Sequence, residues 1–245
     1  MGKIGSAPTN AGGNGTQNHY DGTLFGPPPV IQPSDLLPGD VLLYRPRAPN
    51  TFQRLISKFT DSPYTHAAIC LGDNRVAESL VKTGVTTNLL DQSLGGSQCV
   101  GVLRSQLGFG GNRPAKLNEF VDAVLKNEKF YDAIGAIALP SRSKNYFGNQ
   151  LEFIRMNYGK VTTDDEFAKH SFFCSAFVVA CYSVVGVIGE TAQAAYQPDC
   201  FSPGRLCKDP TFGWLLGYLV PDGGSVPPDD PLDVAAMKWR DATDM

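Results

Sequence analysis

A cysteine and a histidine of this 245-residue chain have surroundings that suit nucleophilic catalysis. Cys174 begins an apolar run for which we predict a helix. The free N–H groups and the positive dipole end of a first helical turn favour a thiolate. His66 starts the alternation His66, Ala68, Cys70 of a predicted strand. An imidazole beside the thiol would lower the thiol pKa and make the pair a nucleophile.

Glu78, on the next predicted strand, is the candidate for orienting the imidazole. If a three-residue loop, 72–74, joins the two strands, Leu71 pairs with Arg75 and Glu78 lies diagonally across from His66 on the same face. A two-residue turn would place Glu78 on the opposite face. We therefore predict an odd loop or a bulge in this hairpin.

Each of these side chains also has a structural interpretation. A histidine on a strand face is most often structural, and Cys174 could be an inert buried thiol like Cys181 on the same predicted helix. His170 precedes Cys174 by four residues, and from that loop we expect it to aim poorly at the thiol. The residues alone leave the catalytic and structural interpretations of Cys174 equally open.

The elements that must position these residues predict an α+β domain, with an antiparallel sheet packed against helices. Predicted strands cover 41–44, 65–71, 75–81, 84–90 and 101–104, and predicted helices cover 51–60, 117–127 and 174–187. The segment 140–171 is longer than a connection needs. It either walls the cleft or forms a solvated excursion.

Three segments are expected along the chain. Residues 1–33 form a Gly/Asn/Pro-rich head, predicted to be disordered, and residues 34–222 form the folded domain. Residues 223–245 form a Pro/Asp-rich tail in which 232–239 has the pattern of a short helix.

Composition and motifs exclude several functional classes. The net charge of −3 lacks the basic footprint of a nucleic-acid binder. The sequence holds no metal cluster, phosphate loop or dinucleotide fingerprint, so no cofactor is expected. The uncharged run 172–189 contains Tyr182 and Ser183, which favours a core helix over an integral membrane segment. Cys200 and Cys207 could pair, although we expect free thiols.

The N-terminus has no apolar segment of the secretory kind, so the chain is expected to be cytoplasmic or exported by a leaderless route. Gly2 and Ser6 fit an N-myristoylation pattern, and whether it is used stays open.

Five motifs, in this order, resemble the circularly permuted branch of the NlpC-type papain-like cysteine peptidase superfamily, and within it the YiiX-like group. They lie at 38–44, 58–69, 76–79, 131–132 and 173–178, and the resemblance covers most of 36–215. It implies a circularly permuted papain-like fold, with Cys174 as nucleophile, His66 as base and Glu78 orienting the imidazole. Two positions depart from the family: Ala68 stands where Gly is common, and Ala176 where Glu is common.

The resemblance further implies that Tyr131 lines the site, that Asp132, Ser175 and Tyr64 contact substrate, and that the Cys174 N–H stabilises an oxyanion. The implied activity is hydrolysis of an amide bond through a thioester, with peptidoglycan peptides as substrate. A toxin delivered by a secretion machine, with an immunity protein as partner, would fit a chain without a leader. A lipid-directed thioesterase or acyltransferase, resembling the lecithin:retinol acyltransferase relatives, is an alternative. An inactive binding module is another.

Overall fold

The computed structural model describes residues 29–127 and 131–234 and contains a six-stranded sheet. The strand order is β4-β3-β2-β1-β5-β6, and every neighbouring pair is antiparallel. The strands are β1 (Val41–Pro46), β2 (His66–Gly72), β3 (Arg75–Leu80), β4 (Gly84–Leu89), β5 (Ser97–Arg104) and β6 (Trp214–Leu219). The expected α+β class with an antiparallel sheet is confirmed.

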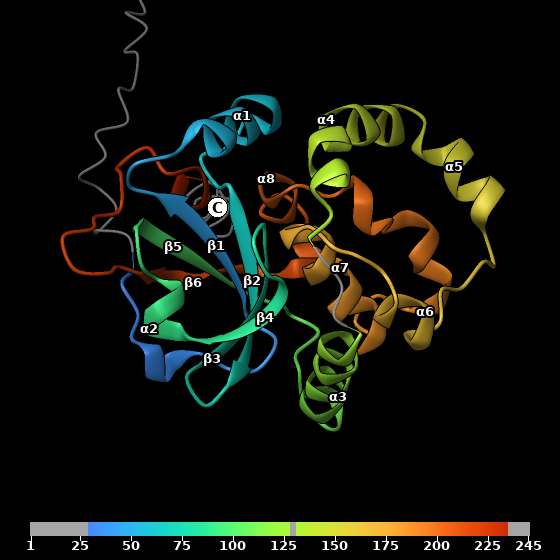
Figure 1. Cartoon of the computed structure of the whole chain (residues 1–245), viewed down its shortest axis with the longest axis horizontal. Coiled ribbons are helices and arrows are strands. Elements are labelled where there is room, and N and C mark those ends of the chain that lie inside the picture. The colour runs from blue at the N-terminus through green and yellow to red at the C-terminus, as the bar shows by residue number, and fades with distance from the viewer. Residues whose placement is uncertain (1–28, 128–130, 235–245) are drawn as a thin grey trace, which may run out of the picture.

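Helices of very different length surround this sheet, and α4 to α7 gather on one side of it (Figure 1). The α-helices are α1 (Thr51–Thr60), α2 (Leu90–Ser93), α3 (Arg113–Lys126), α4 (Ala133–Gly148), α5 (Gln150–Asn157), α6 (Asp164–Ala168), α7 (Cys174–Val184) and α8 (Pro203–Leu206). Short 3-10 helices lie at Pro33–Asp35, Glu190–Ala195, Pro198–Cys200 and Pro210–Phe212.

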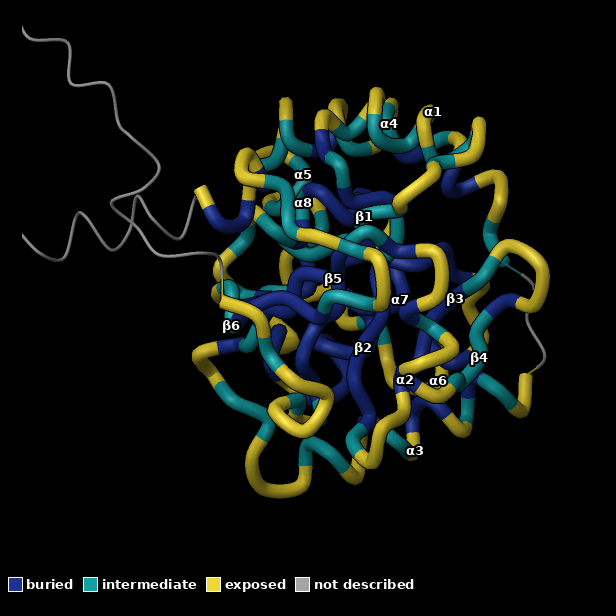
Figure 2. The backbone as a smooth tube through the Cα atoms, turned by 90° about the vertical axis from the view of Figure 1, so that its left-hand side faces the viewer, coloured by how far each residue is buried: buried dark blue, intermediate teal, exposed yellow. Residues whose placement is uncertain are grey.

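Both faces of the sheet are buried, and α7 is the central helix. Every residue of α7 is buried, and its apolar side chains share one core with Val41 and Leu43 of β1. Leu42 and Tyr44 point to the other face, into a smaller core. The two-residue alternation of a strand produces this division. Figure 2 shows α7 and the middle strands as the buried centre of the molecule.

The structure contains elements that the sequence pattern did not predict. Segment 133–168 holds α4, α5 and α6, and α4 continues through Pro140. β6 pairs with β5 from a distant part of the chain. By contrast, α1 begins and ends at the predicted residues, with Asn50 accepting a hydrogen bond from the Gln53 N–H at the N-cap. The predicted helix 174–187 stops at Val184.

The folded part begins earlier than residue 34. Val30 forms a parallel bridge with Tyr218 of β6. The Tyr218 N–H donates to Pro29 O at 2.8 Å, and the Ile31 N–H donates to Tyr218 O at 2.9 Å. Residues 29–31, assigned to the head from composition, therefore extend the sheet edge, and Pro33 begins a 3-10 helix. Residues 1–28, including the myristoylation pattern at Gly2, lie outside the described residues.

Part of the segment 223–245, expected to be a tail, also packs into the folded domain. The carboxylate of Asp230 is fully buried and accepts hydrogen bonds from the hydroxyls of Tyr64, at 2.5 Å, and Tyr218, at 2.7 Å. Arg45 forms an ion pair with it at 3.0 Å. Residues 231–234 start a helical turn in which Leu232 is buried. The remainder of the predicted helix 232–239 lies outside the described residues.

All six cysteines are free thiols, so Cys200 and Cys207 do not pair. Within residues 29–127 and 131–234, none of the helices combines the length and apolar character needed to cross a bilayer.

Candidate active site

The β2–β3 hairpin places Glu78 on the face of His66. Its turn has two residues, Asp73 and Asn74, both with positive φ (50° and 57°), as in hairpin turns that match strand twist. The register shifts between Cys70 and Gly72 and then pairs Ala68 with Glu78. The predicted bulge alternative is thus confirmed, while the three-residue loop is wrong. The bulge restores the face that a two-residue turn alone would have reversed.

The imidazole of His66 and the carboxylate of Glu78 form a short contact, with 2.6 Å between Nε2 and Oε2. The second carboxylate oxygen accepts a hydrogen bond from Asn88 Nδ2 at 2.9 Å. Burial raises the pKa of Glu78, but the hydrogen bonds from His66 and Asn88 outweigh it and leave the pKa below its usual value. Glu78 is therefore an ionised carboxylate with a hydrogen-bond partner on each oxygen, and its residue is only 3% exposed.

Cys174 is the first residue of α7, as predicted. The helical hydrogen bonds start with Phe177 N–H to Phe173 O, so the N–H groups before Phe177 precede the ladder. Burial raises the pKa of the Cys174 thiol, but the hydrogen bond with His66 and those from the N–H groups of Ala67 and Ser175 bring the pKa below its ordinary value.

The pKa of His66 shifts in the opposite direction, upward. Burial lowers its pKa, but hydrogen bonds to Cys174 and Glu78 outweigh that effect and raise the pKa to about 10. Because Nε2 faces Glu78, Nδ1 is the nitrogen left for the thiol. A lowered thiol pKa beside a raised imidazole pKa favours the thiolate–imidazolium form of the pair.

The other cysteines differ from Cys174. Burial raises the pKa of all five, to about 11 for Cys70, Cys200 and Cys207 and to about 12 for Cys99. The pKa of Cys181, on the same helix as Cys174, is raised well above its ordinary value by burial. Cys174 is therefore the one thiol that its surroundings activate.

Three further residues support the imidazole, and the sequence analysis missed them. The Tyr44 ring lies 5.1 Å from the His66 ring across the β1–β2 pair, and the Tyr44 hydroxyl is 2.6 Å from Ser93 Oγ. Ser93 and Asn88 both hydrogen-bond to Glu78. Strand alternation could have found Asn88, because Glu78 pairs with Thr86 and Asn88 follows on the same face.

A cleft of about 380 Å³ opens onto the cysteine, the histidine and the glutamate. One wall is α1, through Phe52, Gln53 and Ile56, and another is the turn 93–97 after α2. No residue of segment 140–171 is among the described residues that line it. Of the two alternatives left open for this segment, the one in which it walls the cleft is therefore wrong.

Of the four residues predicted to line the site or contact substrate, one lines the cleft and three do not. Tyr131 lines the cleft, and burial together with the nearby Cys174 charge raises its pKa, so its hydroxyl remains protonated. Tyr64 is fully buried with its hydroxyl on Asp230. Ser175 is fully buried and donates to Phe201 O at 2.8 Å. Asp132 caps α4 by accepting from the Gly135 N–H at 2.7 Å.

Tyr64, Ser175 and Asp132 therefore hold the fold together rather than line the cleft. His170 is exposed, packs near Phe172 at 6.2 Å between ring centroids and is absent from the described lining of the cleft. The expectation that it does not serve Cys174 agrees with this position.

No protein-family profile matches the chain, and no curated protein matches it. Among solved structures, the chain is similar to one described as the crystal structure of metalloprotein yiiX from Escherichia coli O157:H7. The identity is 18%, the TM-score is 0.38, and the match covers 80% of this chain and 93% of the other. Within the described residues of this chain, no three His, Cys, Asp or Glu side chains gather to hold a metal ion.

Proposed function

We propose that this protein is a cysteine hydrolase in which Cys174, His66 and Glu78 act together. The observation that carries the proposal is the geometry of the three side chains: Cys174 begins α7 beside His66, His66 Nε2 lies 2.6 Å from Glu78 Oε2, and all three line one cleft. These contacts shift the thiol pKa downward and the imidazole pKa upward. A buried structural thiol is expected to shift the other way, as Cys181 does. This contrast speaks against the alternative of an inactive binding module.

In the proposed mechanism, the Cys174 thiolate attacks the carbonyl carbon of the substrate, and the carbonyl oxygen becomes an oxyanion. The Cys174 N–H, at the positive end of α7, is the oxyanion donor. The His66 imidazolium then protonates the leaving group as the tetrahedral intermediate collapses to a thioester. Neutral His66 next takes a proton from water, whose oxygen attacks the thioester and releases the acid and the thiolate.

The lining of the cleft supports an uncharged segment at the scissile bond. Asn50, Gln53 and Gln92 present side-chain amides, and Phe52 and Ile56 add apolar surface. Lysine and arginine are absent from the described lining. Side-chain amides can both donate to and accept from a peptide backbone. We therefore propose an amide bond of a peptide as the substrate class.

The finer proposal, which rests on the motif resemblance, is a permuted papain-like hydrolase of peptidoglycan stem peptides, used as an exported antibacterial effector. An immunity protein would then be its partner. The second candidate is a lipid-directed thioesterase or acyltransferase with the same nucleophile. One observation favours it: apolar and basic side chains gather on the exposed surface of α1 and α4, beside the cleft.

The test is mass spectrometry of purified peptidoglycan digested by the wild-type protein and by Cys174→Ala and Cys181→Ala variants. We expect new stem-peptide fragments from the wild type and from Cys181→Ala, and none from Cys174→Ala. Absence of fragments while Cys174 is labelled rapidly by iodoacetamide would refute the peptidoglycan substrate and favour the lipid candidate. Slow labelling of Cys174, at the rate of free cysteine, would contradict the hydrolase itself.

A further inference from the structure

Helices α1 and α4 lie at the same end of the molecule, in both views (Figures 1 and 2). A groove of about 440 Å³ lies between them. Phe59 and Thr60 of α1 line one side of the groove, and Leu139, Pro140 and Phe147 of α4 line the other.

This groove concentrates positive charge. Lys144, Arg205 and Lys208 line it, and no acidic residue is among its described lining residues. The Arg205 guanidinium is held 3.6 Å above the Phe147 ring centroid by a cation–π contact. Neither α1 nor α4 contains an aspartate or glutamate, although the whole chain has a net charge of −3. Three carboxylates flank the helices: exposed Asp61 follows α1, Asp132 caps the start of α4, and Asp199 pairs with Arg142.

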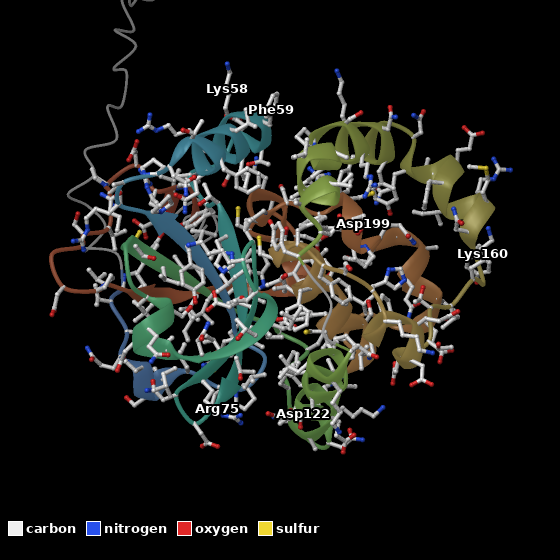
Figure 3. All side chains as sticks on the ribbon, viewed as in Figure 1. Lys58, Phe59, Arg75, Asp122, Lys160 and Asp199 are labelled. Carbon is white, nitrogen blue, oxygen red and sulfur yellow. The ribbon has the colours of Figure 1, made fainter. Side chains whose placement is uncertain are left out.

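Large apolar side chains project on both sides of the groove. Phe59 is 56% exposed on α1, and Ile134 and Ile137 are 79% and 68% exposed on α4. Figure 3 shows Lys58 and Phe59 extending from α1 away from the body of the molecule. Ile134, Ile137 and Lys144 recur at the spacing of one helical stripe. A soluble anion would account for the lysines alone, whereas a bilayer accounts for both kinds of side chain.

We propose that the α1–α4 face docks onto a bilayer containing anionic phospholipid, with a phosphate headgroup in the groove and Phe59, Ile134 and Ile137 in the acyl boundary. A surface that docks onto an anionic bilayer combines lysine or arginine with exposed apolar side chains, as this face does. The same apolar stripe of α1 lines the catalytic cleft nearer the start of the helix, through Phe52 and Ile56, so docking brings the cleft next to the interface. The proposal does not depend on the chemistry at Cys174.

The experiment is cosedimentation of the full chain with phosphatidylcholine vesicles and with vesicles that mix phosphatidylcholine and phosphatidylglycerol. We expect binding to the mixed vesicles only, and weaker binding as salt is added. A lysine near an anionic surface contributes about fivefold to partitioning, so Lys144→Glu/Lys208→Glu should weaken binding by at least about twentyfold. Phe59→Ser/Ile137→Ser should also weaken binding.

The matched control is Lys116→Glu/Lys126→Glu on α3, at the opposite end of the molecule in Figures 1 and 2, which changes the net charge equally. Leu107→Ser, in an exposed loop, controls for loss of an apolar side chain. We expect both controls to bind like the wild type. Equal binding to neutral vesicles, or equal loss in the α3 variant, would overturn the proposal. Repeating the assay with Cys174→Ala separates this outcome from failure of the hydrolase proposal.

Discussion

Glu78 is paired across the sheet with Ala68, two residues beyond His66, and its carboxylate nevertheless reaches His66 Nε2 at 2.6 Å. Diagonal neighbours on one face of an antiparallel pair are within reach of long side chains. Asn88 holds the other oxygen of the carboxylate, so the carboxylate has little freedom to turn away. The bulge between Cys70 and Gly72 creates this arrangement, since without it Glu78 would point to the opposite face.

Replacing the nucleophile should separate activity from stability. Cys174→Ala is expected to reduce hydrolysis by at least about 10⁴-fold, because no other described thiol contacts His66. Its free energy of unfolding should change by about 1 kcal/mol or less. Hydrolysis rates and urea unfolding curves measure the two effects. Cys181→Ala, a buried thiol on the same helix, should keep its activity, and equal losses in both variants would contradict the assignment of Cys174.

Removing the imidazole should raise the pKa of the Cys174 thiol. His66→Ala deletes the largest influence that lowers this pKa, so the value moves up toward its ordinary range near 8.5. Iodoacetamide labelling at neutral pH should slow by about tenfold or more, because the thiolate is the reactive form. His170→Ala is the control, since His170 is exposed and outside the described lining of the cleft. A wild-type labelling profile for His66→Ala would disprove the pair.

The rate should depend on pH as a bell with a wide plateau. The acid limb is set by Cys174, whose pKa is lowered, so the rate rises below the usual thiol range. The alkaline limb is set by His66, and the rate falls as pH passes its pKa of about 10. A plot of kcat/KM against pH tests both limbs. A rate that still rose above pH 8 would mean that the resting thiol is neutral.

Weakening the carboxylate should move only one limb of that profile. Glu78→Gln removes the negative charge that raises the His66 pKa, so the alkaline limb shifts to lower pH. We expect the rate to fall by about tenfold to a hundredfold, because the nucleophile and the base remain but the imidazole is less well oriented. Asn88→Ala should give a smaller change of the same sign. An unshifted limb at the wild-type rate would remove Glu78 from the site.

The buried carboxylate of Asp230 should be a major contributor to stability. Asp230→Ala leaves Arg45 and the hydroxyls of Tyr64 and Tyr218 without their shared acceptor. The expected loss in the free energy of unfolding is about 3 kcal/mol, measured by urea denaturation. Asp229→Ala changes the neighbouring exposed residue and should stay within about 0.5 kcal/mol of the wild type. Similar losses for both variants would mean that Asp230 has no special role.

Local pattern was enough for the elements that carry the candidate site. Alternation and helical spacing predicted β2, β3, α1 and the start of α7 at Cys174. These signals depend on a few neighbouring residues, so they can be read along the chain. Even the face of Glu78 followed from the period of two in a strand, once an odd loop or a bulge was required.

Contacts between residues far apart in the chain decided the elements and side-chain positions that local pattern did not predict. β6 and Asp230 join partners far away in the chain, and no local spacing records which strand or hydroxyl they meet. α4 has little amphipathic pattern and contains Pro140, and it lies against Pro198–Cys200 in the folded chain. The same packing buries Tyr64 and Ser175, so these two side chains do not face the cleft.

The sequence by itself determined which side chains are the candidates for the chemistry: one cysteine at a predicted helix start, and one histidine and one glutamate on adjacent predicted strands. Only the tertiary structure decided that Cys174 is the activated thiol among six. The physical reason is that a pKa depends on the charges and hydrogen bonds within a few ångströms. Those neighbours are assembled by the packing of α7 against β2, from residues more than a hundred positions apart.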